Sequence, residues 1–150
     1  MSRHQWHAPS TSASAPCPAA PPTANHDSLR LALMDAGRQV RAAADDLARL
    51  PAARDDLVRF CRTELLPHLE ADEGWLIEAQ HCPELRLLAQ TIRAEARSMA
   101  AAAHGLTAAT GPCEAVAATR VLHALLAAHA QHEELLLTTW SRLSAGHAEP

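Results

Sequence analysis

The stretch CRTELLPHLEADEGWL at residues 61–76 carries polar residues on an otherwise apolar helical face. Leu65 and Leu76 belong to a series of apolar residues that recurs at the spacing of an amphipathic helix. His68 and Asp72 continue this series four residues apart, so both side chains project from one side of the helix. Burying an imidazole or a carboxylate without a partner costs several kcal/mol. The pair therefore requires a partner in the core.

A second pair of this kind stands near the other end of the chain, in HAQHE at residues 129–133. His129 and Glu133 are again four residues apart, among leucines at helical spacing. Each pair is followed by one more carboxylate, Glu73 in the first case and Glu134 in the second. Imidazoles and carboxylates that converge inside a helical bundle are typical ligands of non-haem iron or manganese. These residues are therefore candidate metal ligands.

The chain as a whole predicts four helices in one domain over residues 25–145. Ala and Leu, both strong helix formers, supply most of the hydrophobic 48% of its 150 residues. Three segments with Pro or Gly-Pro interrupt the helical pattern: LPAARD at 50–55, HCPE at 81–84 and ATGPCE at 109–114. Short loops make consecutive helices antiparallel neighbours. The expected fold is an all-α, antiparallel up-down-up-down four-helix bundle.

Residues 1–24 differ in composition from this domain. They are rich in Pro, Ala and Ser and show no helical periodicity. Such a segment cannot bury enough apolar surface to offset the entropy lost on ordering. We expect a disordered N-terminal arm, in which His4 and His7 could bind a metal only adventitiously.

A third candidate imidazole, His26, lies in register with the apolar residues of the first helix. In antiparallel neighbours, residues equidistant from the connecting turn lie at one height. His26 and His68 average to position 47, about one helical turn from the expected turn at Pro51. His129 is level with Ala96 of the third helix, since their average falls in the last loop. Three helices are therefore expected to bring their imidazoles to one layer.

The composition of the chain argues against several classes of function. The formal net charge is −4, and the 13 basic residues are all arginines without a stripe that could neutralise phosphates. This argues against nucleic acid as a partner. The four cysteines form no CxxC pair, and no stretch approaches the ~20 apolar residues of a membrane span. A cytoplasmic protein without membrane contact is expected.

Three stretches resemble the hemerythrin-like (HHE cation-binding) family: HDSLR at 26–30, CRTELLPHLEADEGWL at 61–76 and AHAQHEELLL at 128–137. The resemblance covers roughly residues 25–143. It implies a four-helix bundle with a non-haem centre of one or two iron ions. Such a centre binds dioxygen, nitric oxide or a peroxide, or senses iron or redox state. The ligands implied by matching motifs are His26, His68 with Asp72, and His129 with Glu133 or Glu134.

The third helix departs from the family pattern. In RAEARSM at 93–99, Glu95 is followed by Ala96 where the resemblance implies a His ligand. Three outcomes are open: Glu95 substitutes as a carboxylate ligand, the site holds one ion instead of two, or the metal is lost. His104 is a weaker substitute, because about 12 Å of helix rise separates it from that level. Asp72 also replaces the usual Glu and shortens its reach.

Two other classes of function stand beside metal binding. In a structural or protein-binding bundle, the ancestral site has decayed and its histidines and Asp72 hydrogen-bond to one another. A hydrolytic enzyme is disfavoured, because His132 and Glu133 begin like an HExxH motif that the next residues do not complete. The sequence names no separate acid, base or substrate pocket. Weak oxidase-like or peroxidase-like turnover is the form of catalysis left open.

Overall fold

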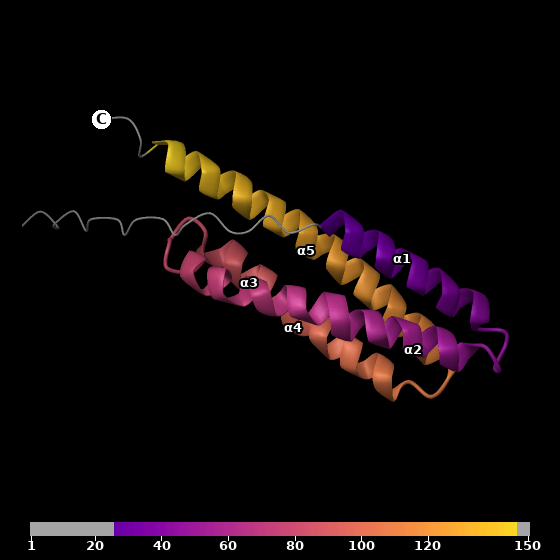
Figure 1. Ribbon diagram of the computed structural model, residues 1–150. Helices are drawn as coiled ribbons and strands as arrows, with labels where there is room; N and C mark the ends of the chain where they lie inside the picture. The colour runs from indigo at the N-terminus through magenta and orange to yellow at the C-terminus, as the bar shows by residue number, and fades with distance from the viewer. Residues whose placement is uncertain (1–25, 147–150) are drawn as a thin grey trace, which may run out of the picture.

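The computed structural model describes residues 26–146, which form four helical rods and contain no strand (Figure 1). The first rod is α1 (His26–Ala43). The second consists of α2 (Leu50–Phe60), a π-helical turn η1 (Cys61–Leu65) and α3 (Leu66–Ala79), which follow one another directly. The third and fourth rods are α4 (Arg86–Ala108) and α5 (Pro112–Gly146). The predicted all-α class is confirmed, while the predicted arm at 1–24 lies outside the described residues.

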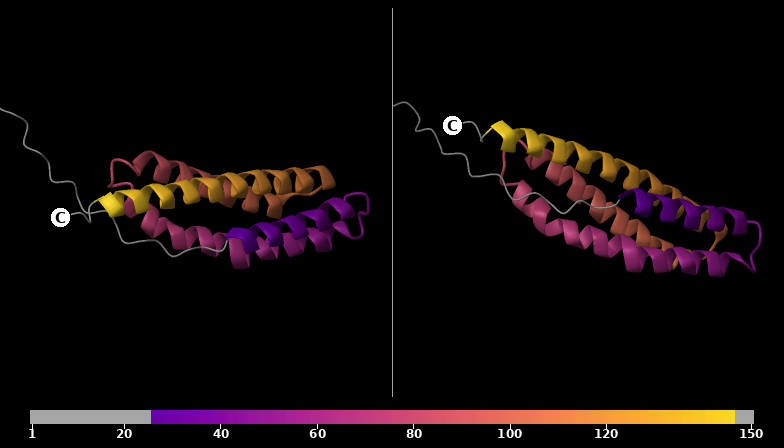
Figure 2. Two further views of the ribbon diagram at one scale, coloured as in Figure 1. Left: turned by 90° about the horizontal axis from the view of Figure 1, so that it is seen from above. Right: turned by 45° about the horizontal axis from the view of Figure 1, so that its top comes forward.

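The rods lie side by side in an elongated bundle (Figure 2). α1 packs against α2 and α5, and α4 packs against α2, α3 and α5. α1 has 18 residues and α5 has 35, so α1 runs along only one half of α5 (Figure 1). The first residue of α1, His26, is therefore placed near the middle of the bundle instead of at its end.

The first connection is not where the sequence predicts it. The sequence predicts an interruption at residues 50–55, but α2 begins at Leu50 and Pro51 lies in its first turn. Proline is tolerated there because the first N–H groups of a helix have no partner within it. The connection instead spans residues 44–49. Position 47, the midpoint of His26 and His68, falls inside this connection, which removes the offset expected between the two residues.

Buried apolar side chains form two clusters along the bundle. The larger cluster joins α1, α2, η1, the start of α3, α4 and α5, and includes Leu57 and Leu126. The smaller joins α3, α4 and α5 around Leu76 and Leu136. On α5, Leu126 of the larger cluster and Leu136 of the smaller one flank His129 and Glu133 in sequence. A polar layer therefore separates the two apolar clusters.

A π turn interrupts the second rod directly before His68. The backbone N–H of Leu66 donates to the carbonyl of Cys61, five residues earlier. Pro67 follows, and it has no N–H to donate while its ring would clash with the carbonyl of Thr63 in a regular α-helix. A π turn inserts one residue into the helical register and is frequent at functional sites. It sets the rotation of α3, and with it the direction of His68.

Candidate metal centre

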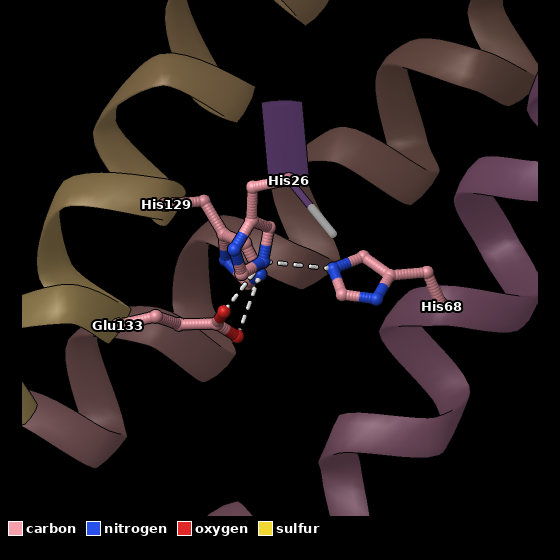
Figure 3. A group of neighbouring side chains, drawn as sticks. All are labelled: His26, His68, His129 and Glu133. Carbon is pink, nitrogen blue, oxygen red and sulfur yellow. Dashed lines mark hydrogen bonds and ion pairs between the residues drawn. The ribbon is translucent and has the colours of Figure 1, made fainter. Parts of the chain in front are cut away.

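Four side chains from three rods meet in the polar layer (Figure 3). His26 is the first residue of α1, His68 lies in the first turn of α3, and His129 and Glu133 come from α5. Each offers one ligand atom, and these atoms all lie within 4.8 Å of one another. Atoms bound to one ion at about 2.0–2.2 Å lie roughly 3–4 Å apart. The group therefore needs only a small contraction to hold a cation.

The closest contacts in this group join the ring nitrogens to one another and to the carboxylate of Glu133. Nε2 of His26 lies 2.6 Å from Oε2 of Glu133 and 3.1 Å from Nε2 of His68. Nε2 of His129 lies 3.2 Å from the other oxygen of Glu133. The three rings are nearly perpendicular to one another. Three Nε2 atoms and two carboxylate oxygens thus border one small volume.

Hydrogen bonds among the described residues do not satisfy this group. His129 is 0% exposed, and neither of its ring nitrogens has a hydrogen-bond partner among them. Its 3.2 Å contact with Glu133 meets the distance for an ion pair but not the geometry of a hydrogen bond. An unpaired buried polar group costs about 1–3 kcal/mol. A cation would accept the lone pair of Nε2 and remove part of this cost.

Hydrogen bonds alone do not explain both close contacts of the His26 ring. Its Nε2 faces both His68 and Glu133, yet one nitrogen can carry only one proton in this plane. That proton can serve one of the two contacts fully. A metal ion accepts several lone pairs at once, and imidazoles with a carboxylate are a usual ligand set for zinc and non-haem iron. The residues present therefore fit a metal ion.

The electrostatics keep Glu133 and His68 in forms that bind a cation, whereas His26 must give up its proton to do so. Burial raises the pKa of Glu133, but its contacts with His129 and His26 outweigh burial and hold the pKa at about 2. Glu133 is then a carboxylate, which raises the pKa of His26 through their hydrogen bond. Burial, with the positive charge of His26, lowers the pKa of His68. A neutral His68 presents a lone pair.

Asp72 lies at the edge of the group. Its Oδ2 is 3.3 Å from Nε2 of His68 and is buried without a hydrogen-bond partner among the described residues. Burial and the negative charge of Glu133 raise the pKa of Asp72 to about 7. The sequence predicts Asp72 as a ligand, and the structure places it beside a ligand atom. Its carboxyl group can supply a further oxygen once it has lost its proton.

Two other predicted candidates lie apart from the four clustered residues. Glu73 forms a salt bridge with Arg93 of α4, which lowers the pKa of Glu73. Glu134 is exposed on α5. Each stands one residue beyond a member of the polar layer, which turns its side chain about 100° around the helix. The salt bridge of Glu73 and the exposure of Glu134 place both side chains outside the group of four.

The third helix contributes a carboxylate beside the cluster and no imidazole within it. Oε1 of Glu95 lies 2.7 Å from Nδ1 of His132, and Oε2 lies 4.0 Å from Nδ1 of His129. Ala96 packs against the larger apolar cluster, and His104 is exposed. His132 was not predicted from the sequence to be a site residue. Its position three residues after His129, on a neighbouring helix face, was the available signal.

No family model, no curated protein and no solved structure matches this chain. Its class therefore rests on its own fold and site. Residues 26–146 define an all-helical protein with a His/Glu cluster that could hold a metal ion. Over residues 26–146, the helices are too short or too polar to cross a membrane.

Proposed function

We propose that this protein is a hemerythrin-like, up-down-up-down four-helix bundle that binds non-haem iron. The ligands in this proposal are His26, His68, His129 and Glu133. The observation that carries it is the burial of His129, whose ring nitrogens have no hydrogen-bond partner among the described residues although three other ligand atoms lie close by. A bound cation explains why a fully buried polar ring is retained there.

The arrangement supports one ion in preference to two. The four ligand atoms form a single cluster, and Ala96 occupies the position on α4 where the resemblance implies a further imidazole. Glu73 and Glu134, which could have served a second ion, point elsewhere. Four protein ligands, with Asp72 beside them, are enough for one ion of the non-haem type.

When bound, such an ion supplies Lewis acidity and free coordination positions for a small ligand such as dioxygen, nitric oxide or a peroxide. The side chains around the ion supply charge, an apolar surrounding and a site for a proton. Glu133 neutralises one positive charge, and an apolar cluster packs on either side of the layer. Asp72, whose pKa is raised to about 7, can hold or release a proton at Oδ2 next to His68. Binding or sensing of a small oxidant is the function that this set of groups supports best.

Anaerobic reconstitution tests the proposal. The full chain is incubated with ferrous iron, passed through a desalting column, and examined for iron content and for ultraviolet charge-transfer absorption after exposure to air. We expect one iron per chain and an absorption that excess chelator removes. Zinc and manganese are offered in parallel to rank the metals. A colourless protein that retains no metal would contradict the proposal.

One observation favours a second function, a metal-free structural bundle. The contact of 2.6 Å between His26 and Glu133 joins α1 to α5 without any ion. In that case the cluster serves as an interhelical polar bridge, and the protein acts as a structural or protein-interaction module. Unfolding in chelator separates the two functions, because the metal-free bundle would be equally stable with and without chelator.

A further inference from the structure

Glu95 approaches the cluster from behind His129. Its Oε1 lies 2.7 Å from Nδ1 of His132, which holds the carboxylate in place. Its Oε2 is buried, has no hydrogen-bond partner among the described residues, and lies 4.0 Å from Nδ1 of His129. Nδ1 of His129 is likewise buried without a partner. Two unsatisfied polar atoms of opposite kind thus face each other.

The distance of 4.0 Å is too long for a hydrogen bond, whose N···O separation is about 2.7–3.2 Å. A shift of about 1 Å, or a small rotation of either side chain, closes this gap. Among the described residues, Nδ1 of His129 has no hydrogen-bond partner. Forming this bond would satisfy a nitrogen and an oxygen that each cost about 1–3 kcal/mol when buried alone.

We propose that Glu95 is a positioning residue for His129, accepting a hydrogen bond from its Nδ1–H. The bond places the proton of the neutral ring on Nδ1, so that the lone pair of Nε2 is available to a cation held between His129 and Glu133 (Figure 3). The role of Glu95 in metal binding rests on the proposed function. Its hydrogen bond with Nδ1 of His129 does not, because that bond can form without a metal ion.

The geometry assigns Glu95 this role in place of that of a ligand. Its Oε2 approaches the His129 ring at Nδ1, whereas the ring contacts Glu133 through Nε2. Glu95 is also absent from the group of four whose ligand atoms lie within 4.8 Å. A carboxylate that orients a metal-binding imidazole through its second nitrogen is a common arrangement in metalloproteins.

His132 anchors the positioning residue. It lies one turn of α5 from His129 and reaches across to α4, where Glu95 is the only carboxylate of the helix. The side chain of His132 is 37% exposed, and its Nδ1–H can donate to Oε1 of Glu95 at 2.7 Å. A carboxylate held at one oxygen keeps its second oxygen aimed at His129. The three residues form one series from the surface to the buried ring.

The test compares Glu95→Ala with Glu95→Gln in the full chain. Gln keeps a side-chain oxygen that can accept from Nδ1–H, whereas Ala removes it. Titration with Co²⁺ alone is expected to show affinity about 10–100-fold weaker for Glu95→Ala, with substantial recovery in Glu95→Gln. The visible bands of bound Co²⁺ should keep their positions, because the ligand set is unchanged. Glu134→Ala, which removes an exposed carboxylate of α5, is the matched control and should bind like the wild type.

Nitrogen-15 NMR of the metal-free protein tests the same inference without any metal. The His129 ring is expected to carry a proton on Nδ1 in the wild type and to lose it in part in Glu95→Ala. A dominant Nε2–H tautomer in the wild type would overturn the proposal. So would Co²⁺ bands that move in both Glu95 variants, since that is the result for a direct ligand. If the wild type binds no metal, the proposed function fails while the tautomer result still decides the role of Glu95.

Discussion

Nε2 of His26 lies 2.6 Å from Oε2 of Glu133, so the first residue of α1 is joined to the middle of α5. This contact sits where the larger apolar cluster gives way to the smaller one. A charged contact at a helix end would fray in water, but here both side chains are largely buried. The start of α1 is thereby part of the candidate metal centre, and the order of this helix should depend on what the centre holds.

Metal binding should stabilise the fold. An ion that binds only the folded chain raises the free energy of unfolding by about 2.7 kcal/mol when its free concentration is a hundredfold above Kd. We expect this increase for the wild type in denaturant titrations with Zn²⁺ against chelator. Glu133→Gln, which keeps the shape but removes the charge, should show a much smaller increase. Equal increases in the two proteins would show that the ion binds elsewhere.

The metal-free protein should become less stable as pH rises from about 4 to 7. Burial and the charge of Glu133 raise the pKa of Asp72 to about 7 in the folded state, against about 3.9 in the unfolded chain. Between these values the folded state holds a proton that the unfolded state has lost, so the free energy of unfolding falls with pH. Measured in chelator against Asp72→Asn, the loss is at most about 4 kcal/mol. Parallel pH profiles for the two proteins would contradict the raised pKa.

Gly37→Ala should destabilise the protein by about 1–3 kcal/mol. A Cβ at Gly37 would lie 2.7 Å from Cγ2 of Thr119 and 3.1 Å from Nε2 of His123, both on α5. Thr119 cannot easily give way, because it is fully buried and its hydroxyl donates to the carbonyl of Ala115. The clash outweighs the gain of about 0.5–1 kcal/mol that Ala brings inside a helix.

Gly105→Ala is the matched control for this substitution. Gly105 also lies inside a helix, but a Cβ there meets no atom within 4 Å. It should therefore stabilise the protein by about 0.5–1 kcal/mol. Denaturant midpoints of the two variants should move in opposite directions. Stabilisation by both substitutions would show that α1 and α5 can move apart at little cost.

The helices and most of the cluster are predictable from spacing. His68, His129 and Glu133 each continue an apolar series at three- or four-residue intervals, which is the condition for facing a core. Height in the bundle follows from counting residues to the turns. Pro51 shows the limit of this method, because a proline can open a helix as readily as it can end one.

The finer roles within the polar layer were not predictable in the same way. Glu73 and Glu95 are both carboxylates near the layer, and spacing alone does not distinguish them. Their partners do: Glu73 is paired with Arg93, and Glu95 with His132. Both partners lie on another helix, so the pairings depend on helix rotation, which a one-dimensional pattern does not contain. The π turn at Cys61–Leu65 alters that rotation by one residue.

The number of iron ions bound per chain tests most directly whether these histidines form a metal centre. Wild type, His68→Ala, His129→Ala and the exposed control His104→Ala are loaded with ferrous iron under identical conditions, desalted and analysed for bound iron. The geometry predicts one equivalent for the wild type and for His104→Ala, and far less than one for the other two, provided that circular dichroism shows all four to be folded. Equal iron in all four folded proteins would contradict a centre built from these imidazoles.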